Sequence, residues 1–413
     1  MADLKTTKIS GVQGRVPGHV PVPRYRVFLG HILFTQGFRP FFLLAGVWAP
    51  LALALFVASI EGWLSVPTAL DPIAWHFHEM IFGFVVAAMA GFLLTAIPNW
   101  TGRLPLQGVP LIVLVVLWLG GRLAMATSAI IGNAAAAVID IAFLAVLLTA
   151  ITREILAGKN WRNLPIVIAV GVLLAGNVIF HAGQLDLYDD TTGPRLIIAV
   201  VIILISVIGG RIIPSFTRNW LAARKAKRLP APTDKFDLLT LAVTIFTLAW
   251  WTIFPFAEMT GILALVSSLL NAVRLSRWLG LSTTPEALVW VLHLGFVWIP
   301  VGLFLIGISN LWGNIPQIVA VHAFTAGAMG TMILAVMSRA TLGHTGHSLT
   351  ASPLLTLAYV LLTLSVMVRV AAPFFAVVYL PMLLVAAAAW ISAFVFFLVS
   401  CGPHLLRPKR KQA

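Results

Sequence analysis

Long apolar runs recur along the whole chain, separated by short polar segments. Each run has about the ~20 residues that a helix needs to cross a hydrocarbon core of ~30 Å. Helices are expected because every backbone polar group inside a bilayer must bond within its own segment. The pattern predicts an all-α polytopic bundle with twelve transmembrane helices, at roughly 41–60, 76–97, 106–126, 130–151, 164–182, 195–213, 237–257, 259–276, 286–307, 315–337, 354–371 and 376–400.

Composition supports a membrane protein rather than a soluble one. The 413 residues are 60% apolar and only 10% charged, whereas soluble domains carry about a quarter charged residues. The single cysteine, Cys401, excludes an internal disulfide framework and cysteine-based metal clusters. We therefore expect the lipid bilayer to be the main environment of the chain.

The positive charge is distributed unevenly between the two sides of the predicted bundle. A net charge of +14 could indicate nucleic acid binding. All but three of the 27 Lys and Arg residues fall on one side, however, and the exceptions are Arg122, Arg195 and Arg369. The positive-inside rule then puts both termini in the cytoplasm, without a nucleic acid partner. The chain divides into a cytoplasmic tail (1–40), a transmembrane domain (41–400) and a basic cytoplasmic tail (401–413).

The stretch IAWHFHEMIFG brings His76, His78 and Glu79 into the second apolar segment. Ionisable groups at membrane depth are expensive and usually functional. His76 and His78 lie ~200° apart around a regular helix, so they cannot bind one metal ion together. His76 and Glu79 share a face at i, i+3. One histidine is therefore expected to bind a metal or cofactor while the other joins a second site.

Further histidines lie in three other predicted helices. His322 is ~12 Å from the outer end of its helix, and His293 is at a similar depth from the inner end. His78 and His322 are favoured as ligands, because imidazole suits iron and copper, and a haem needs one histidine per face. His181 is more often an interfacial hydrogen bonder, and His293 could bond a backbone carbonyl. The small residues that follow His78 and His322 leave room for a flat macrocycle, but helix packing also explains them.

Several other charged residues are candidates for a role. An outer-half haem would place its propionates near Arg122, Arg195 and Arg369. Asp140 has no local partner, which makes it a candidate for a proton path or a structural hydrogen bond. Arg211 is expected to snorkel to the headgroups or to hold an anionic group such as a carboxylate.

Five motifs resemble the NnrS family of bacterial membrane proteins, and together they span nearly the whole chain. They are HxHEMxFGF (76–84), GFLLTAxPNWTGRLP (91–105), VLHLGFVWIPVGL (291–303), VHAFTAGAMGTM (321–332) and MSRATLGHTGH (337–347). The resemblance implies a twelve-helix protein of the bacterial inner membrane that contains haem b and copper. It also implies a role in the response to nitric oxide and in denitrification. His347 departs from the arginine expected there, so it and His344 are interpreted as loop or proton-path residues.

Three functions stay open from the sequence. In the favoured one, His78 and His322 bind haem iron, and His76, His181 and His293 are candidates for copper or a second haem. Nitric oxide would bind or react at the haem, with an electron donor that the sequence does not identify, so an oxidoreductase activity is uncertain. The second is a cofactor-free secondary transporter with a proton relay of His76, Glu79, Asp140 and His293. The third is a haem or copper delivery protein.

Overall fold

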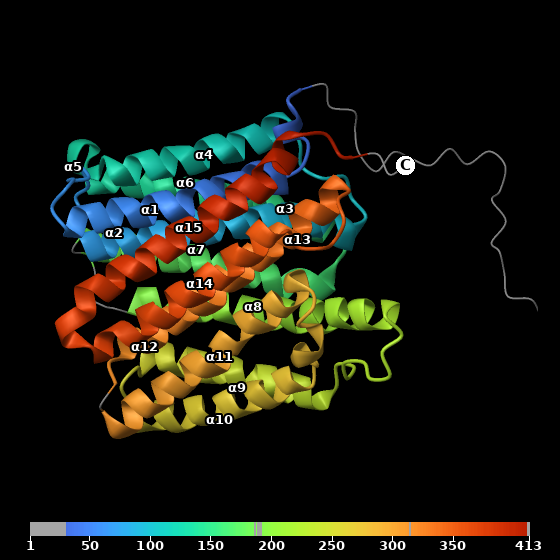
Figure 1. The fold of residues 1–413 in the computed structure, drawn as a ribbon. Helices are drawn as coiled ribbons and strands as arrows, with labels where there is room; N and C mark the ends of the chain where they lie inside the picture. Colours follow the sequence, from blue (N-terminus) through green and yellow to red (C-terminus); the bar gives the residue numbers. More distant parts are fainter. Residues whose placement is uncertain (1–29, 186, 188–191, 314, 411–413) are drawn as a thin grey trace, which may run out of the picture.

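A computed structural model describes residues 30–410 except for 186, 188–191 and 314. It contains twelve helical spans that are long and apolar enough to cross a membrane (Figure 1), and no strand among these residues. The predicted all-α, twelve-helix fold is confirmed, and the twelve apolar helices suggest a multi-pass membrane protein. The basic residues predicted for the N-terminal tail before Gly30 lie outside the described part of the chain.

The spans follow one another with short connections. They are α1 (Phe38–Ile60), α2–η2–α3 (Pro72–Thr101), α4 (Val109–Ala126), α6 (Asn133–Ala157), η3–α7 (Trp161–Gln184), α8 (Thr192–Ala223), α9 (Lys235–Ile253), α10 (Glu258–Ser276), α11 (Ala287–Trp312), α12–η5–α13 (Gln317–Thr345), α14–η6 (Pro353–Phe374) and η7–α15 (Ala376–Leu406). The largest difference from the sequence is α8, which was expected to end near 213. Hydropathy marks where the bilayer ends, whereas the helix continues into polar residues beyond it.

Neighbouring spans pack side by side, and four of them form the centre. The chain folds α10 against α11, α14 against α15, and α15 back against α1. The most enclosed spans are α2–η2–α3, α8, α11 and α12–η5–α13, while the others expose one side. His76, His78, His293 and His322 all lie on these central spans.

The two ends of the bundle differ in charge. The C-terminal ends of α1, α4, α7, α9, α11 and α14 lie at one end, here called the distal end, and the sequences that link them to the next helices contain no lysine or arginine. The opposite end, called the basic end, carries the start of α1 and the end of α15. This asymmetry follows the pattern on which the predicted orientation rests.

Two central spans change helix type directly after a histidine. α2 (Pro72–His78) passes into the π-helix η2 (Glu79–Val85), and α12 (Gln317–His322) passes into the π-helix η5 (Ala323–Gly330). π-helical turns are rare and are often found at functional sites. η5 is rich in small residues, whereas η2 contains a single glycine, and tryptophan side chains pack against the glycines of both segments, as Trp48 does against Gly83.

Candidate functional site

His76 and His322 line one cavity of about 310 Å³ near the distal end. The Asp71 carboxylate caps α2 by accepting from the Ile73 and Ala74 N–H groups at 2.9 and 3.0 Å, which sets His76 a little over one turn into the helix. His322 ends α12, the short helix that starts the tenth span. Two separate spans thus bring an imidazole to the same space.

Both imidazoles have a nitrogen that is not used in structural contacts. The His322 Nδ1 lies 2.9 Å from the Ile318 carbonyl oxygen, and since a carbonyl only accepts, Nδ1 carries the proton. The His322 Nε2 then keeps its lone pair. The His76 ring stacks on Phe56 with centroids 4.1 Å apart, and its Nδ1 is buried without a partner. These two imidazoles could therefore bind a metal ion or the iron of a cofactor.

The rest of the cavity wall is mainly apolar, with a few polar groups. Arg369 of α14 and Tyr379 line it, and Ser365 and Thr325 add hydroxyl groups. An apolar cavity with a small number of convergent polar groups is the usual form of a cofactor or ligand site. The arginine supplies one cation for an acidic substituent of such a ligand.

A buried network of charged residues occupies the opposite face of α2. The fully buried His78 contacts Glu79 Oε1 through Nδ1 at 3.0 Å and Asp140 Oδ2 through Nε2 at 3.1 Å. His181 Nε2 lies 3.1 Å from the same Asp140 oxygen, and the Asn177 side chain donates to it at 2.8 Å. Residues of α2, η2, α6 and α7 therefore converge on one carboxylate.

Arg122 of α4 completes this network. Its Nη1 donates to both carboxylate oxygens of Glu79 at 2.9 Å, and its Nη2 pairs with Asp140. Two buried carboxylates face one guanidinium, and each ring nitrogen of His78 faces a carboxylate oxygen. These groups sum to one negative charge, which is neutralised if His78 is an imidazolium or if a monovalent metal cation such as Cu(I) binds. Either form avoids an uncompensated buried charge, which would cost several kcal/mol.

Three atoms of the network also have the spacing of a metal site. One ligand atom each from His78, Asp140 and His181 lie within 4.8 Å of one another, and all three residues are buried. Two imidazoles and one carboxylate suit copper, iron or zinc. Because Arg122 pairs with the other Asp140 oxygen, Oδ2 is left to face the two imidazoles.

The structure regroups the histidines that the sequence singled out. His78 and His322 were expected to act together, but His322 shares its cavity with His76, and His78 joins Asp140 and His181. The expectation that His76 and Glu79 share a face is wrong, because Glu79 opens the π-helix and bonds to His78 and Arg122. Spacing rules for a regular α-helix no longer hold beyond that residue.

Of two expectations about buried charges, one holds and one needs correction. Asp140 has no partner on its own helix, as expected, and its hydrogen bonds to three other spans make it the centre of the buried network. Arg122 was expected near haem propionates, but both carboxylates of the network hold it. Sequence reasoning missed Asn177, although it lies one helical turn before His181 on the same face.

The remaining predicted site residues lie elsewhere. His293 Nε2 is 2.8 Å from the Thr217 hydroxyl, rather than at the backbone carbonyl that was considered. Arg195 donates to the Thr252 carbonyl oxygen at 3.2 Å, linking α8 to α9, and does not line the His76–His322 cavity. His344 lies in the last turn of α13 instead of in a loop, because the helix continues to Thr345.

Comparison with known proteins identifies a family. The family model described as NnrS protein matches residues 32–409, which is nearly the whole chain. A search of curated proteins finds no match. The family match confirms the resemblance that the five sequence motifs indicated.

Proposed function

This chain belongs to the NnrS family, and we propose that it is a haem- and copper-binding protein of the bacterial inner membrane that acts in the nitric oxide response. The observation that carries the proposal is the shared cavity of His76 and His322, each with a nitrogen left for a ligand. The family resemblance supplies haem b and copper as the expected groups.

The cavity residues fit a haem. His76 and His322 would hold the iron, the apolar wall would enclose the macrocycle, and Arg369 would neutralise a propionate. A bound haem would supply a redox-active iron centre for chemistry with nitric oxide. The His322 Nδ1–H bond to Ile318 fixes the tautomer and the orientation of the ring, as the outer hydrogen bond of a ligating histidine generally does. The apolar walls keep bulk water away and admit a small apolar diatomic molecule from the lipid.

The buried network fits copper as the second site. His78, His181 and Asp140 would be the ligands. Glu79 holds the second ring nitrogen of His78, and Arg122 holds both carboxylates in place. These contacts are the outer-shell partners that orient metal ligands. Because His76 and His78 point to opposite faces of α2, the haem and copper sites would lie on the two sides of one helix.

The charge asymmetry supports an orientation for both sites. With the basic end in the cytoplasm, both termini are cytoplasmic and the two sites lie in the outer half of the membrane. A nitric oxide molecule from either compartment or from the lipid can reach them through apolar surroundings. The electron donor, if nitric oxide is reduced or oxidised, would be a separate partner.

The proposal is tested by purifying the protein in mild detergent and recording oxidised and reduced visible spectra, with iron and copper analysis. We expect a Soret band with sharp reduced bands of haem b, shifted by nitric oxide. His322→Ala should lose most of the haem, while His31→Ala, which changes an exposed histidine, should keep it.

A colourless and metal-free protein that transports a solute with protons would favour the transporter instead. Transfer of haem or copper to an acceptor protein would favour delivery.

A further inference from the structure

A second polar cavity lies at the basic end, between α3, α8 and α13. It measures about 470 Å³, and its polar lining comes from Arg211, Arg339, His344, Thr95 and Asn99. No carboxylate is among the residues that line it. The cavity therefore presents two guanidinium groups and no anion of its own, close to where membrane headgroups would lie.

Both arginines have donors to spare. Arg211 makes one long hydrogen bond of 3.5 Å, to Asn163 Oδ1. Arg339 packs its guanidinium over the Phe216 ring at 4.1 Å. Within the described residues neither arginine forms a salt bridge. Glu286 interacts electrostatically with Arg339, but its carboxylate already accepts hydrogen bonds from the Leu288 and Ala351 N–H groups.

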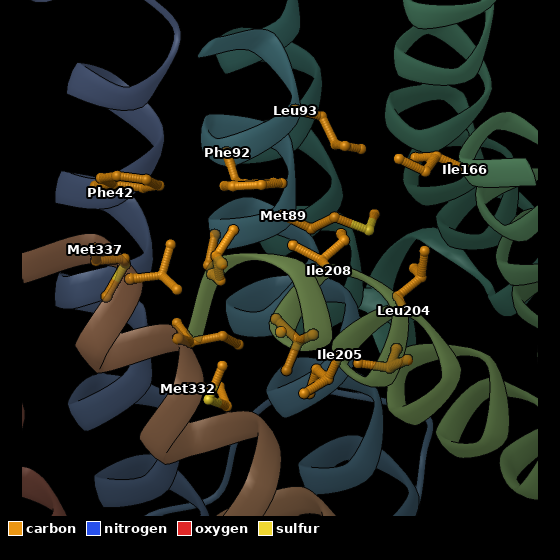
Figure 2. Close-up of a pocket in the computed structure, with 17 residues that line it drawn as sticks. Phe42, Met89, Phe92, Leu93, Ile166, Leu204, Ile205, Ile208, Met332 and Met337 are labelled. Atoms are coloured by element: carbon orange, nitrogen blue, oxygen red, sulfur yellow. The ribbon is translucent and has the colours of Figure 1, made fainter. Parts of the chain in front are cut away.

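An apolar slot continues from this cavity into the bundle. The slot holds about 110 Å³, and side chains such as Met89, Leu204, Ile205 and Met332 surround it (Figure 2). The two spaces adjoin each other, because they share the lining residues Phe42, Phe92, Ile166, Ile208, Ile212 and Val336. From Arg211 to Leu204 the path runs seven residues along α8, about 10 Å toward the middle of the membrane. The combined space is charged at one end and apolar at the other.

We propose that this composite space binds one anionic phospholipid, with its phosphate on Arg211 and Arg339 and one acyl chain in the slot. Arginine is the side chain best suited to phosphate, because its planar fork donates two parallel hydrogen bonds. Basic pockets between membrane helices are suited to anionic headgroups on the cytoplasmic side. A neutral headgroup would leave two cations without a counter-charge, so the charge of the cavity favours an anion.

The lipid is tested by native mass spectrometry of the purified, delipidated protein titrated with phosphatidylglycerol or phosphatidylcholine. We expect one phosphatidylglycerol to stay bound at collision energies that remove phosphatidylcholine. The double variant Arg211→Gln/Arg339→Gln should weaken this binding at least tenfold. Arg162→Gln, an exposed arginine at the same end, should leave it unchanged. Arg211→Lys should weaken binding less, since charge remains and only the fork is lost. Equal retention of the two lipids would overturn the proposal.

A second variant separates a lipid from a free anion. Ile205→Trp fills the slot and leaves both arginines in place, so phosphatidylglycerol binding should fall while the haem spectrum is retained. If Ile205→Trp has no effect and inorganic phosphate displaces the lipid, the cavity binds a headgroup-sized anion and the lipid assignment is wrong. If the double arginine variant loses haem instead of lipid, the two guanidinium groups bind the haem propionates, and this result also contradicts the proposal. The haem absorbance per protein distinguishes this result from a failure of the haem proposal at His76 and His322.

Discussion

His76 and His322 belong to the second and the tenth membrane span, and they line the same cavity. Each is followed closely by a π-helical segment, which begins three residues after His76 and one residue after His322. The imidazoles point into an apolar space that also receives Arg369. This relationship carries the haem proposal, and several consequences can be measured.

Arg369 should affect the midpoint potential of the haem but not the amount of haem bound. A nearby cation stabilises the reduced, less positive form of a haem, so Arg369→Gln should lower its midpoint potential while most haem stays bound. Arg195→Gln removes a cation that does not line the cavity and should leave the potential unchanged. Spectroelectrochemical titration of both variants measures the shift. An equal effect of the two substitutions would show that Arg369 has no special place beside the cofactor.

His181 should control copper and not haem. Removing one of three proposed ligands, as in His181→Gln, should reduce copper per protein at least tenfold, because metal affinity depends on each imidazole. His293→Gln serves as the matched control, since His293 contacts Thr217 and no carboxylate of the network. Copper and iron are counted by mass spectrometry of the elements. Loss of copper in the His293 variant alone would move the site to the other end of the bundle.

The ion pair between Arg122 and Asp140 should show strong coupling in stability. Asp140→Leu leaves Arg122 without one of its two carboxylates, and breaking a buried pair costs about 3–5 kcal/mol. Arg122→Met is expected to cost a similar amount. The double variant should be more stable than the sum of the two losses, because Glu79 and His78 still pair with each other. Thermal unfolding in detergent gives the three shifts, and simple additivity would argue against a coupled network.

The orientation can be tested because the chain has a single cysteine. In a Cys401→Ser background, Ser65→Cys at the distal end should react with an impermeant thiol reagent in intact spheroplasts. Ser348→Cys, in the loop after α13 at the basic end, should react only after lysis. Both serines are exposed, which makes the two positions comparable. The reverse labelling pattern would place the termini outside.

The sequence predicted the helices well and the grouping of side chains less well. Hydropathy and charge report on the bilayer, so the twelve spans follow from them directly. The contacts of Asp140 do not, because its partners lie on three other spans, and nothing local in the sequence indicates them. The pairing of His78 with His322 rested on residue type and on depth in the membrane, which do not report the direction in which each imidazole points. Helical spacing did separate His76 from His78 correctly, because both precede the π-helix.

The most direct test compares His76→Gln with His78→Gln, two substitutions of the same kind placed two residues apart on one helix. The quantity measured is haem per protein, from the pyridine haemochrome of each variant purified in detergent. We expect His76→Gln to lose most of its haem, and His78→Gln to keep haem while losing copper. If His78→Gln loses the haem and His76→Gln retains it, the cavity of His76 and His322 is not the haem site, and the central claim is wrong.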